Sequence, residues 1–354
     1  KKVYSMSVVL ITGSCGLVGS DSVEFFISKG FDVVGIDNNS RLKFFGKDGD
    51  INWIKNRLVK KYKKYAHKNI DIRNFSSLEK IFIKYKNLIK LIIHSAAQPS
   101  HDWARNNVFE DFDINAKGTI NLLELTKKYC YDAPFIFMST NKVYGDNPNK
   151  LKIIEKKERW ELKSNDKCFK GIDEKFSIDD CTHSFFGVSK TYADLMVQEY
   201  GKNIGLKTVC FRAGCITGPN HSGATLHGFL SYLVKASLKM KKYNLIGYKG
   251  KQVRDNLHSH DLVNCFWEFY KKPRYGEIYN IGGGRYSNCS IIEALKYVEE
   301  IAKINVKKKI LKTPRVGDHI WYISDTSKFK KHYPRWKQRY NTKKIIEELI
   351  EHQK

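Results

Sequence analysis

Three glycines follow a short apolar run near the start of the chain, where Val8 to Ser20 reads VVLITGSCGLVGS. The run is typical of a buried parallel strand, and a helical pattern follows the glycines. Gly13 permits a tight turn, Gly16 leaves room for a phosphate beside the backbone, and Gly19 lets the next helix pack on the strand. That helix would point its first N–H groups at the anion. The stretch therefore predicts a site for the pyrophosphate of a dinucleotide, with a plain strand–turn–helix unit as the alternative.

A carboxylate follows at the place where a dinucleotide would present its ribose. The second apolar run, Phe31 to Ile36, ends in Asp37, which comes 18 residues after Gly19. An acidic side chain there accepts hydrogen bonds from both ribose hydroxyls of NAD and repels the additional phosphate of NADP. We therefore expect the cofactor to be NAD.

Further cofactor contacts are expected where the third and fourth strands end. Asp71 and Ile72 end the third expected strand, and the small residues Ala96 and Ala97 follow the fourth. Packing alone would explain each residue, but ligands of doubly wound sheets bind at the carboxyl ends of successive strands. The expected cofactor-binding residues up to this point are Gly13, Cys15, Gly16, Leu17, Val18, Gly19, Asp37, Asn38, Asp71, Ile72, Ala96 and Ala97.

The elements that position these residues alternate between strand and helix, which predicts an α/β fold with a Rossmann-type, doubly wound parallel sheet. We expect strands at 8–12, 32–36, about 68–71, 91–95, 135–139, 207–212 and 277–281. We expect helices near 17–29, 50–64, 75–85, 103–129, 186–203, 224–240, 260–271 and 290–303. Residues 1–213 would form the NAD-binding domain, and 214–354 a smaller substrate-binding part with some interleaving. The highly charged segment 150–180 would lie over the pocket mouth as a lid, or be a solvated insertion.

Composition and cysteine usage exclude several classes of protein. The 354 residues contain no run of about 18 apolar residues, so no membrane-spanning helix is expected. The first residues run straight into the first strand, which leaves no room for a cleavable signal. The eight cysteines form no Cys-x-x-Cys pair or metal-ligand spacing. We therefore expect reduced thiols, no bound metal and a cytoplasmic location.

The formal net charge of +26 raises the question of a nucleic-acid partner. The lysines are spread over many helices and loops, and no arginine-rich recognition helix occurs. Nucleic-acid binding is therefore not expected as the main function. The positive potential would instead attract an anionic substrate such as a nucleotide diphosphate.

Seven further stretches carry a resemblance that spans nearly the whole chain. They are SHDWARNN at 100–107, DFDINAKGTINLLE at 111–124, STNKVYGD at 139–146, GIDE at 171–174, FFGVSK at 185–190, GPNHSG at 218–223 and GKQVRDNLHSHDL at 250–262. Together they resemble the extended short-chain dehydrogenase/reductase family, which includes nucleotide-sugar epimerases and dehydratases. Within the family, the likeness is strongest to epimerases that invert C2 of a CDP-activated hexose.

The resemblance implies hydride chemistry on a nucleotide-linked sugar. NAD would oxidise the C2 carbinol to a ketone and then return hydride to the other face, without net redox change. By position, Thr140 matches the residue that hydrogen-bonds the reacting hydroxyl. Lys190 matches the lysine that holds the nicotinamide ribose. Dehydratases of the family carry an acid pair after the threonine, whereas this chain has Asn141 and Lys142, which disfavours elimination.

One position departs from the family pattern, because Phe186 stands where the catalytic tyrosine of a Tyr-x-x-x-Lys motif belongs. Phenylalanine cannot carry a proton. Tyr144 or His101 could serve as the base, or Thr140 could relay the proton to water or to His101. Alternatively, the chain binds NAD and a nucleotide sugar without fast chemistry. A nucleotide-sugar 4-epimerase or oxidoreductase is a further possibility.

The resemblance also implies substrate contacts and an assembly. Arg254 and Arg315 match arginines that grip the diphosphate of the substrate, through the bidentate contacts that a guanidinium makes. Asn141, Asn220, His221 or Ser222 would meet the sugar or the base. The expected helices 103–129 and 186–203 match those with which relatives form dimers, so a homodimer is expected by analogy.

Overall fold

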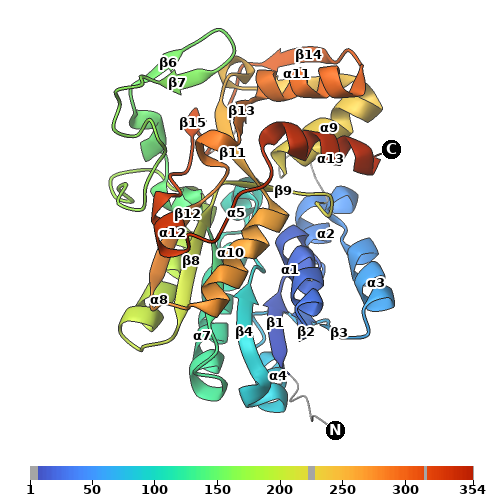
Figure 1. Ribbon diagram of the computed structural model, residues 1–354, viewed down its shortest axis with the longest axis vertical. Helices are drawn as coiled ribbons and strands as arrows, with labels where there is room; N and C mark the ends of the chain where they lie inside the picture. The colour runs from blue at the N-terminus through green and yellow to red at the C-terminus, as the bar shows by residue number, and fades with distance from the viewer. Residues whose placement is uncertain (1–6, 222–227, 315–316, 354) are drawn as a thin grey trace.

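A seven-stranded parallel sheet forms the centre of the computed structural model, which describes residues 7–221, 228–314 and 317–353 (Figure 1). Its strands, in spatial order, are β12 (Glu277–Ile281), β8 (Thr208–Ala213), β5 (Phe135–Thr140), β4 (Ile89–His94), β1 (Val8–Thr12), β2 (Asp32–Ile36) and β3 (Tyr65–Lys68). The order reverses between β1 and β4, as in a doubly wound sheet. The predicted Rossmann-type α/β fold is confirmed, and β1, β2 and β12 have the predicted bounds.

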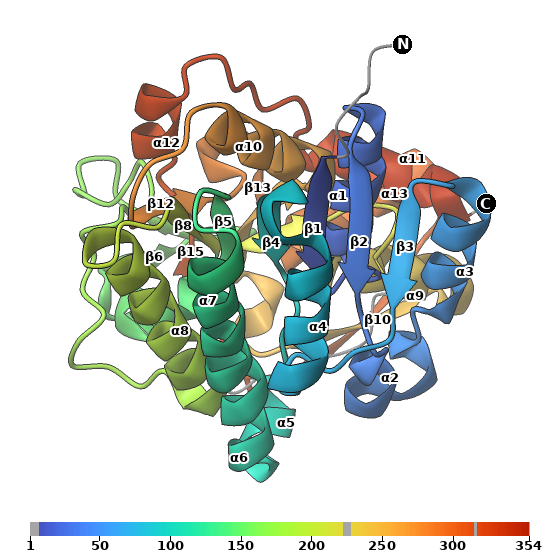
Figure 2. The same cartoon turned by 90° about the horizontal axis from the view of Figure 1, so that it is seen from below.

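Both faces of the sheet are covered, because successive side chains of each strand point to opposite sides. Val9 and Ile11 of β1 belong to one hydrophobic core, and Val8 and Leu10 belong to the other. The first core is shared with α1 (Leu17–Ser28), α3 (Asn52–Lys61), α10 (Ser259–Lys271) and α12 (Ser327–His332). The second is shared with α4 (Phe75–Tyr85), α7 (Gly118–Tyr129) and α8 (Ser184–Lys202), which lie along one face in Figure 2.

The predicted helix over 103–129 is wrong as a single element. The chain instead forms α5 (His101–Asn106), α6 (Val108–Phe112), a π-helical turn at Asp113–Lys117, and α7. The side chain of Asn115, in the π-helical turn, hydrogen-bonds both the backbone N–H and the C=O of Gln98, and donates to Ser189 of α8 at 3.1 Å. These tertiary contacts hold the π-helical turn against α8 and the segment that follows β4. The spacing of hydrophobic residues in the sequence cannot reveal such contacts.

The third strand lies three residues earlier than predicted, at Tyr65–Lys68 rather than about 68–71. The carboxylate of Asp71 accepts hydrogen bonds from the backbone N–H and the guanidinium of Arg73, which turns the chain toward α4. Side-chain bonds of this kind compete with an extended strand. Asp71 and Ile72 therefore follow the strand instead of ending it.

A second unit lies at the carboxyl ends of the parallel strands (Figure 1). In it, β11 (Val253–His258) pairs with β13 (Asn288–Ser290), β15 (Trp321–Tyr322) and β9 (Cys215–Thr217). A separate pair is formed by β10 (Lys242–Ile246) and β14 (Lys307–Leu311). A hydrophobic core joins α9 (Phe229–Met240), α11 (Ile291–Ala302) and α13 (Thr342–Gln353). The sequence analysis did not predict these strands or α13, whereas it did predict helices close to α9 and α11.

The charged segment 150–180 is anchored to this second unit. It contains a hairpin of β6 (Ile153–Glu155) and β7 (Trp160–Leu162). The buried Glu161 accepts hydrogen bonds from the guanidinium of Arg285 and from the indole of Trp321. No helix among the described residues is long and apolar enough to cross a membrane.

Candidate active site

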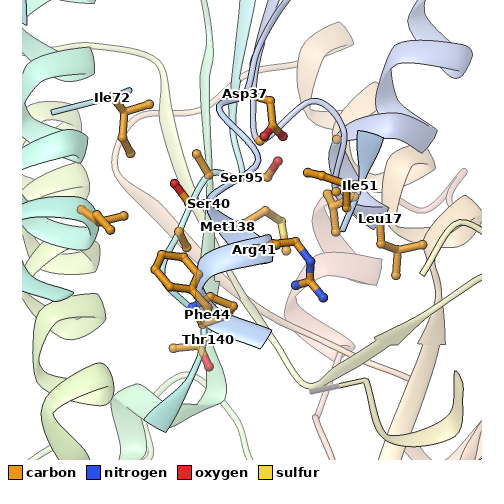
Figure 3. A pocket seen from close by; sticks show the side chains of 18 of the residues that line it. Leu17, Asp37, Ser40, Arg41, Phe44, Ile51, Ile72, Ser95, Met138 and Thr140 are labelled. Carbon is orange, nitrogen blue, oxygen red and sulfur yellow. The ribbon is translucent and has the colours of Figure 1, made fainter. Parts of the chain in front are cut away.

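A cavity of about 290 Å³ lies where β1, β2, β4 and β5 end. It runs from Asp37 at one end to Thr140 at the other, and the side chains of Arg41 and Phe44 lie between them (Figure 3). The last two belong to α2 (Ser40–Phe45), a short helix after β2. The sequence analysis missed both residues, because α2 is too short to show helical periodicity.

The glycine turn forms one wall of the cavity. Gly13 has φ of +68°, and its N–H donates to the carbonyl of Ile36 at 2.8 Å, which joins the turn to β2. A Cβ on Gly19 would stand 2.0 Å from the carbonyl oxygen of Gly13, so only glycine lets α1 start this close. The first turn of α1 has no acidic residue and no side-chain cap. Its N–H groups are therefore available to a phosphate.

Asp37 is held in position for a ribose. Its Oδ2 accepts the N–H of Cys15 at 3.0 Å, and its Oδ1 accepts the N–H of Asn39 at 2.9 Å. Each carboxylate oxygen keeps a second lone pair, so both can also accept a ribose hydroxyl. Burial raises the pKa of this carboxyl, and the two backbone bonds oppose that effect. The two backbone hydrogen bonds thus hold the Asp37 carboxylate in a position that fits the ribose of NAD.

Every residue of the predicted cofactor set lines the cavity except Cys15. The Cys15 thiol is buried beside Ser14 and Tyr65, and burial raises its pKa to about 11. Cys15 therefore acts on the site through its backbone N–H, which positions Asp37, and not through its sulfur. Asn38 and Asp71 also contact each other, at 3.1 Å between the amide nitrogen and the carboxylate.

The reactive end of the cavity contains the three residues that the motifs single out. Thr140, Phe186 and Lys190 line it together with Gly214. Lys190 donates to the carbonyl of Met138 at 2.7 Å, and its ammonium lies 4.1 Å from the ring centroid of Phe137. Burial lowers its pKa to about 8, opposed by the carboxylate of Asp194.

The two proposed substitute bases differ in their surroundings. The ring of His101 packs edge-on against Phe186, with 4.9 Å between centroids, and its Nδ1 lies 2.8 Å from the hydroxyl of Ser184. Burial, assisted by the charge of Lys142, lowers the pKa of His101 to about 3, which keeps the imidazole neutral at physiological pH.

Tyr144 is fully buried and does not line the cavity. Its hydroxyl donates to Asn280 at 2.7 Å and accepts from Arg212 at 3.2 Å. Burial raises its pKa to about 12. Neither side chain lines the cavity, but His101 packs against Phe186, which does, whereas Tyr144 is held by Asn280 and Arg212.

A second, smaller pocket of about 70 Å³ lies beyond β9. Gly214 and Ile216 line the first cavity, and Cys215 between them lines the second pocket, so the two share β9 as a wall. Arg254 lines the second pocket and forms an ion pair with Asp318. Arg315 and Ser222, both named from the sequence, lie outside the described residues.

The other residues named as substrate contacts lie elsewhere. The side chain of Asn220 donates to Asp21 of α1 and accepts from Arg57 of α3 at 3.0 Å. His221 lines the cofactor cavity. Asn141 is buried and accepts a hydrogen bond from the Thr140 hydroxyl at 3.4 Å. His221 thus belongs to the cofactor cavity, whereas Asn141 and Asn220 line neither pocket.

Gly16 and Gly19 should respond differently to alanine. A Cβ on Gly16 would meet only the carbonyl oxygen of Gly13, at 3.4 Å, whereas on Gly19 it would clash with that oxygen. We expect Gly16→Ala to fold with a free energy of unfolding within about 1 kcal/mol of wild type, yet to bind NAD at least about tenfold more weakly. Gly19→Ala should lose both the stability of the fold and the binding of NAD. Calorimetry of unfolding and of NAD binding would measure this, and unchanged NAD affinity in Gly16→Ala would contradict it.

Known proteins resemble the chain over most of its length. Residues 9–282 match the model of the NAD dependent epimerase/dehydratase family. CDP-paratose 2-epimerase of Salmonella typhi is 31% identical over 327 residues, covering 90% of this chain and 91% of that protein. dTDP-glucose 4,6-dehydratase of Neisseria meningitidis serogroup B is 25% identical over 331 residues, covering 90% of this chain and 82% of that protein.

A solved structure shows the same fold. UDP-glucuronic acid 4-epimerase from Bacillus cereus, in complex with UDP-glucuronic acid and NAD, superposes with a TM-score of 0.78 at 23% identity and 98% coverage of both chains. The predictions of family and cofactor are thereby confirmed. The glycine turn, Asp37 and the family match together identify the chain as a member of the NAD-dependent epimerase/dehydratase family, an enzyme of nucleotide-sugar chemistry that uses NAD.

Proposed function

We propose that the enzyme inverts C2 of a CDP-activated sugar, with CDP-paratose as the substrate, and that it supplies polysaccharide synthesis in the cytoplasm. The observation that carries the reaction type is the pair Asn141-Lys142 directly after Thr140, where no carboxylic acid is present to expel water. The likeness to CDP-paratose 2-epimerase favours C2 as the reacting centre. The free thiols of all eight cysteines suit a reducing compartment.

The residues at the reactive end have separate tasks in this reaction. The hydroxyl of Thr140 hydrogen-bonds the sugar hydroxyl that becomes the ketone oxygen, and the Lys190 ammonium binds the nicotinamide ribose. Bound NAD supplies the hydride acceptor and then the donor. The buried wall formed by Met138, Phe186 and Ala213 excludes water, which protects the ketone between the two transfers.

The second pocket suits the nucleotide, and one side chain favours cytosine. Gln252 is 3% exposed, and its Nε2 donates to the carbonyl of Ile246 at 2.8 Å. This bond fixes the amide orientation. Its Oε1 has no hydrogen-bond partner among the described residues, and Gln252 lines the pocket. An acceptor matches the amino group at C4 of cytosine, whereas uracil and thymine carry a carbonyl there.

A C2-deuterated substrate tests the proposed reaction. With CDP-paratose deuterated at C2, we expect an epimerised product that keeps the deuterium, because NAD carries the same hydride away and back. Mass spectrometry of the product, with absorbance near 340 nm to follow transient NADH, would measure this. Loss of the label to solvent would refute hydride transfer at C2. Turnover confined to C4 epimerisation of UDP-sugars would favour the alternative 4-epimerase.

We further propose that His101 takes the proton that a tyrosine at position 186 would take. The Phe186→Tyr variant places a phenol one helical turn from Lys190. Because His101 already supplies the base, the rate of this variant should exceed that of the wild type by less than about tenfold, whereas His101→Asn should lose about 10²-fold or more. In the Phe186→Tyr background, His101→Asn should leave the rate nearly unchanged, because the phenol then takes the proton. Single-turnover rates of the four proteins would show this coupling. Equal effects of His101→Asn in both backgrounds would argue against His101 as the base.

We also propose a homodimer, built on α6 and α8. Large apolar side chains are exposed on both helices: Val108, Phe109, Phe112, Phe185, Val188, Tyr192 and Leu195. Phe109 is 90% exposed, which is costly for an isolated chain.

Aspartate substitutions would test the dimer. In sedimentation velocity, we expect the double variant Phe109→Asp, Val188→Asp to be monomeric, because two buried carboxylates would oppose association. Ile310→Asp, at a 58% exposed residue of β14 in the second unit, is the matched control and should stay dimeric. A monomeric wild type would refute the dimer.

A further inference from the structure

Lys142 lines neither cavity itself, but its neighbours in sequence and in space line both. It lies in a short 3₁₀ turn, Asn141–Tyr144, that follows Thr140 at the end of β5. Its ammonium donates to the carbonyl of Gly317 at 2.7 Å and lies 3.4 Å from Nδ1 of His319. Thr140 lines the cofactor cavity, and Asp318, between these two partners, lines the second pocket. The Lys142 side chain therefore leads from the reacting centre to the nucleotide pocket.

The charged groups around the Lys142 ammonium give this part of the site a net positive charge. Arg254 of β11 is a second cation, and Asp318 is the one carboxylate among the described charged groups that act on Lys142. His101 of α5 and His319 are neutral, because burial lowers the pKa of both. Cys215 of β9 is a neutral thiol, since burial raises its pKa to about 11. Two cations thus share one carboxylate in a buried site.

The excess charge already affects Lys142 itself. Burial, and then the neighbouring Arg254, lower its pKa to about 8, while Asp318 opposes the change. An ammonium in this state gains more from a bound anion than an exposed lysine does, because the anion replaces lost hydration and offsets the repulsion.

We propose that the Lys142 ammonium binds the diphosphate of the nucleotide sugar, together with Arg254. This inference rests on the proposed function, because it needs the base in the second pocket and the sugar at Thr140. The diphosphate links these two parts of the substrate and must therefore pass the space beside Lys142. A lysine at this position thus gives the enzyme a contact to the substrate anion where the dehydratase pattern has an acid.

The binding should be linked to a proton in a defined pH range. Below about pH 8 the free enzyme already carries the Lys142 proton, so binding takes up none. Above about pH 8 the free amine is largely neutral, and the anion raises its pKa, so binding takes up to one proton. Affinity should then fall as the pH rises, by up to tenfold per pH unit. Proton uptake by His101 or His319 would instead appear at acidic pH, because their pKa values lie lower.

Calorimetry with CDP-glucose tests this directly, because its diphosphate bears no titrating proton near neutral pH. The NAD-loaded full-length enzyme would be titrated from pH 6.5 to 9.5 in buffers of different ionisation enthalpy. We expect proton uptake that begins near pH 8 in the wild type and is absent in Lys142→Met. At pH 7, Lys142→Met should bind CDP-glucose about ten- to a hundredfold more weakly. Its affinity for cytidine, which has no phosphate, should not change.

Two further variants separate charge from structure. Lys142→Arg should restore most of the CDP-glucose affinity and shift the pH dependence upward, because arginine stays protonated. Lys150→Met, at an exposed lysine of the same segment, should behave as wild type. Lys190 also has a pKa of about 8, and Lys142→Arg separates the two lysines, because this variant should bind CDP-glucose without proton uptake near pH 8 if Lys142 takes the proton. Lys142→Arg therefore tests the inference even if Lys142→Met does not fold.

Several results would overturn the inference. The first is a wild type that binds CDP-glucose without proton uptake above pH 8. The second is a folded Lys142→Met with unchanged affinity. The third is a Lys142 effect seen only with UDP-glucuronate, which would assign the ammonium to a sugar carboxylate. In each case the nucleotide still binds, so the proposed function survives. A wild type that binds no nucleotide sugar would instead refute both.

Discussion

The contact between α1 and the turn after β1 is the constraint on which the rest of the site depends. Helix and strand approach so closely at Gly19 and Gly13 that no side chain fits between them. This contact sets the direction of α1 and therefore the place where its first N–H groups converge. The same turn is bonded to β2 through Ile36 and, by the N–H of Cys15, to Asp37. The phosphate end and the ribose end of the cofactor site are thus positioned by one short stretch of backbone.

The reactive end depends on a buried ion pair instead. Arg212 of β8 donates twice to Asp194 of α8, at 2.8 and 3.1 Å, and both side chains are almost fully buried. Ser139 also donates to Asp194. These bonds join β8 to β5, which carries Thr140, and to α8, which carries Lys190. Removal of one partner from a buried pair costs about 3–5 kcal/mol, so the position of α8 is strongly fixed.

The sequence was sufficient to predict the large sheet and most of the strand-end residues that line one side of the cavity. Alternating runs and glycine spacing are local signals, and a buried parallel strand such as β1 gives a strong one. The short strands β9, β13 and β15 gave no such signal, since two or three residues cannot show a period. The π-helical turn depends on hydrogen bonds from the Asn115 side chain to the backbone of Gln98. The end of β3 depends on the hydrogen bond that the Asp71 carboxylate accepts from the backbone N–H of Arg73. The placement of Asn220 at α1 and α3 was equally hidden, because its partners are remote in sequence.

The pairing of β12 with β8 has a consequence for synthesis of the chain. β8 ends at Ala213, and its outer edge is covered only when β12, which ends at Ile281, has emerged. At 5–20 residues per second, this interval lasts about 3–14 s. During that time the nascent sheet presents an unpaired, apolar edge, which is a template for wrong pairing. The large sheet can therefore close only after β9, α9, β10 and β11 of the second unit have been made, so part of the second unit is already present when the sheet is completed.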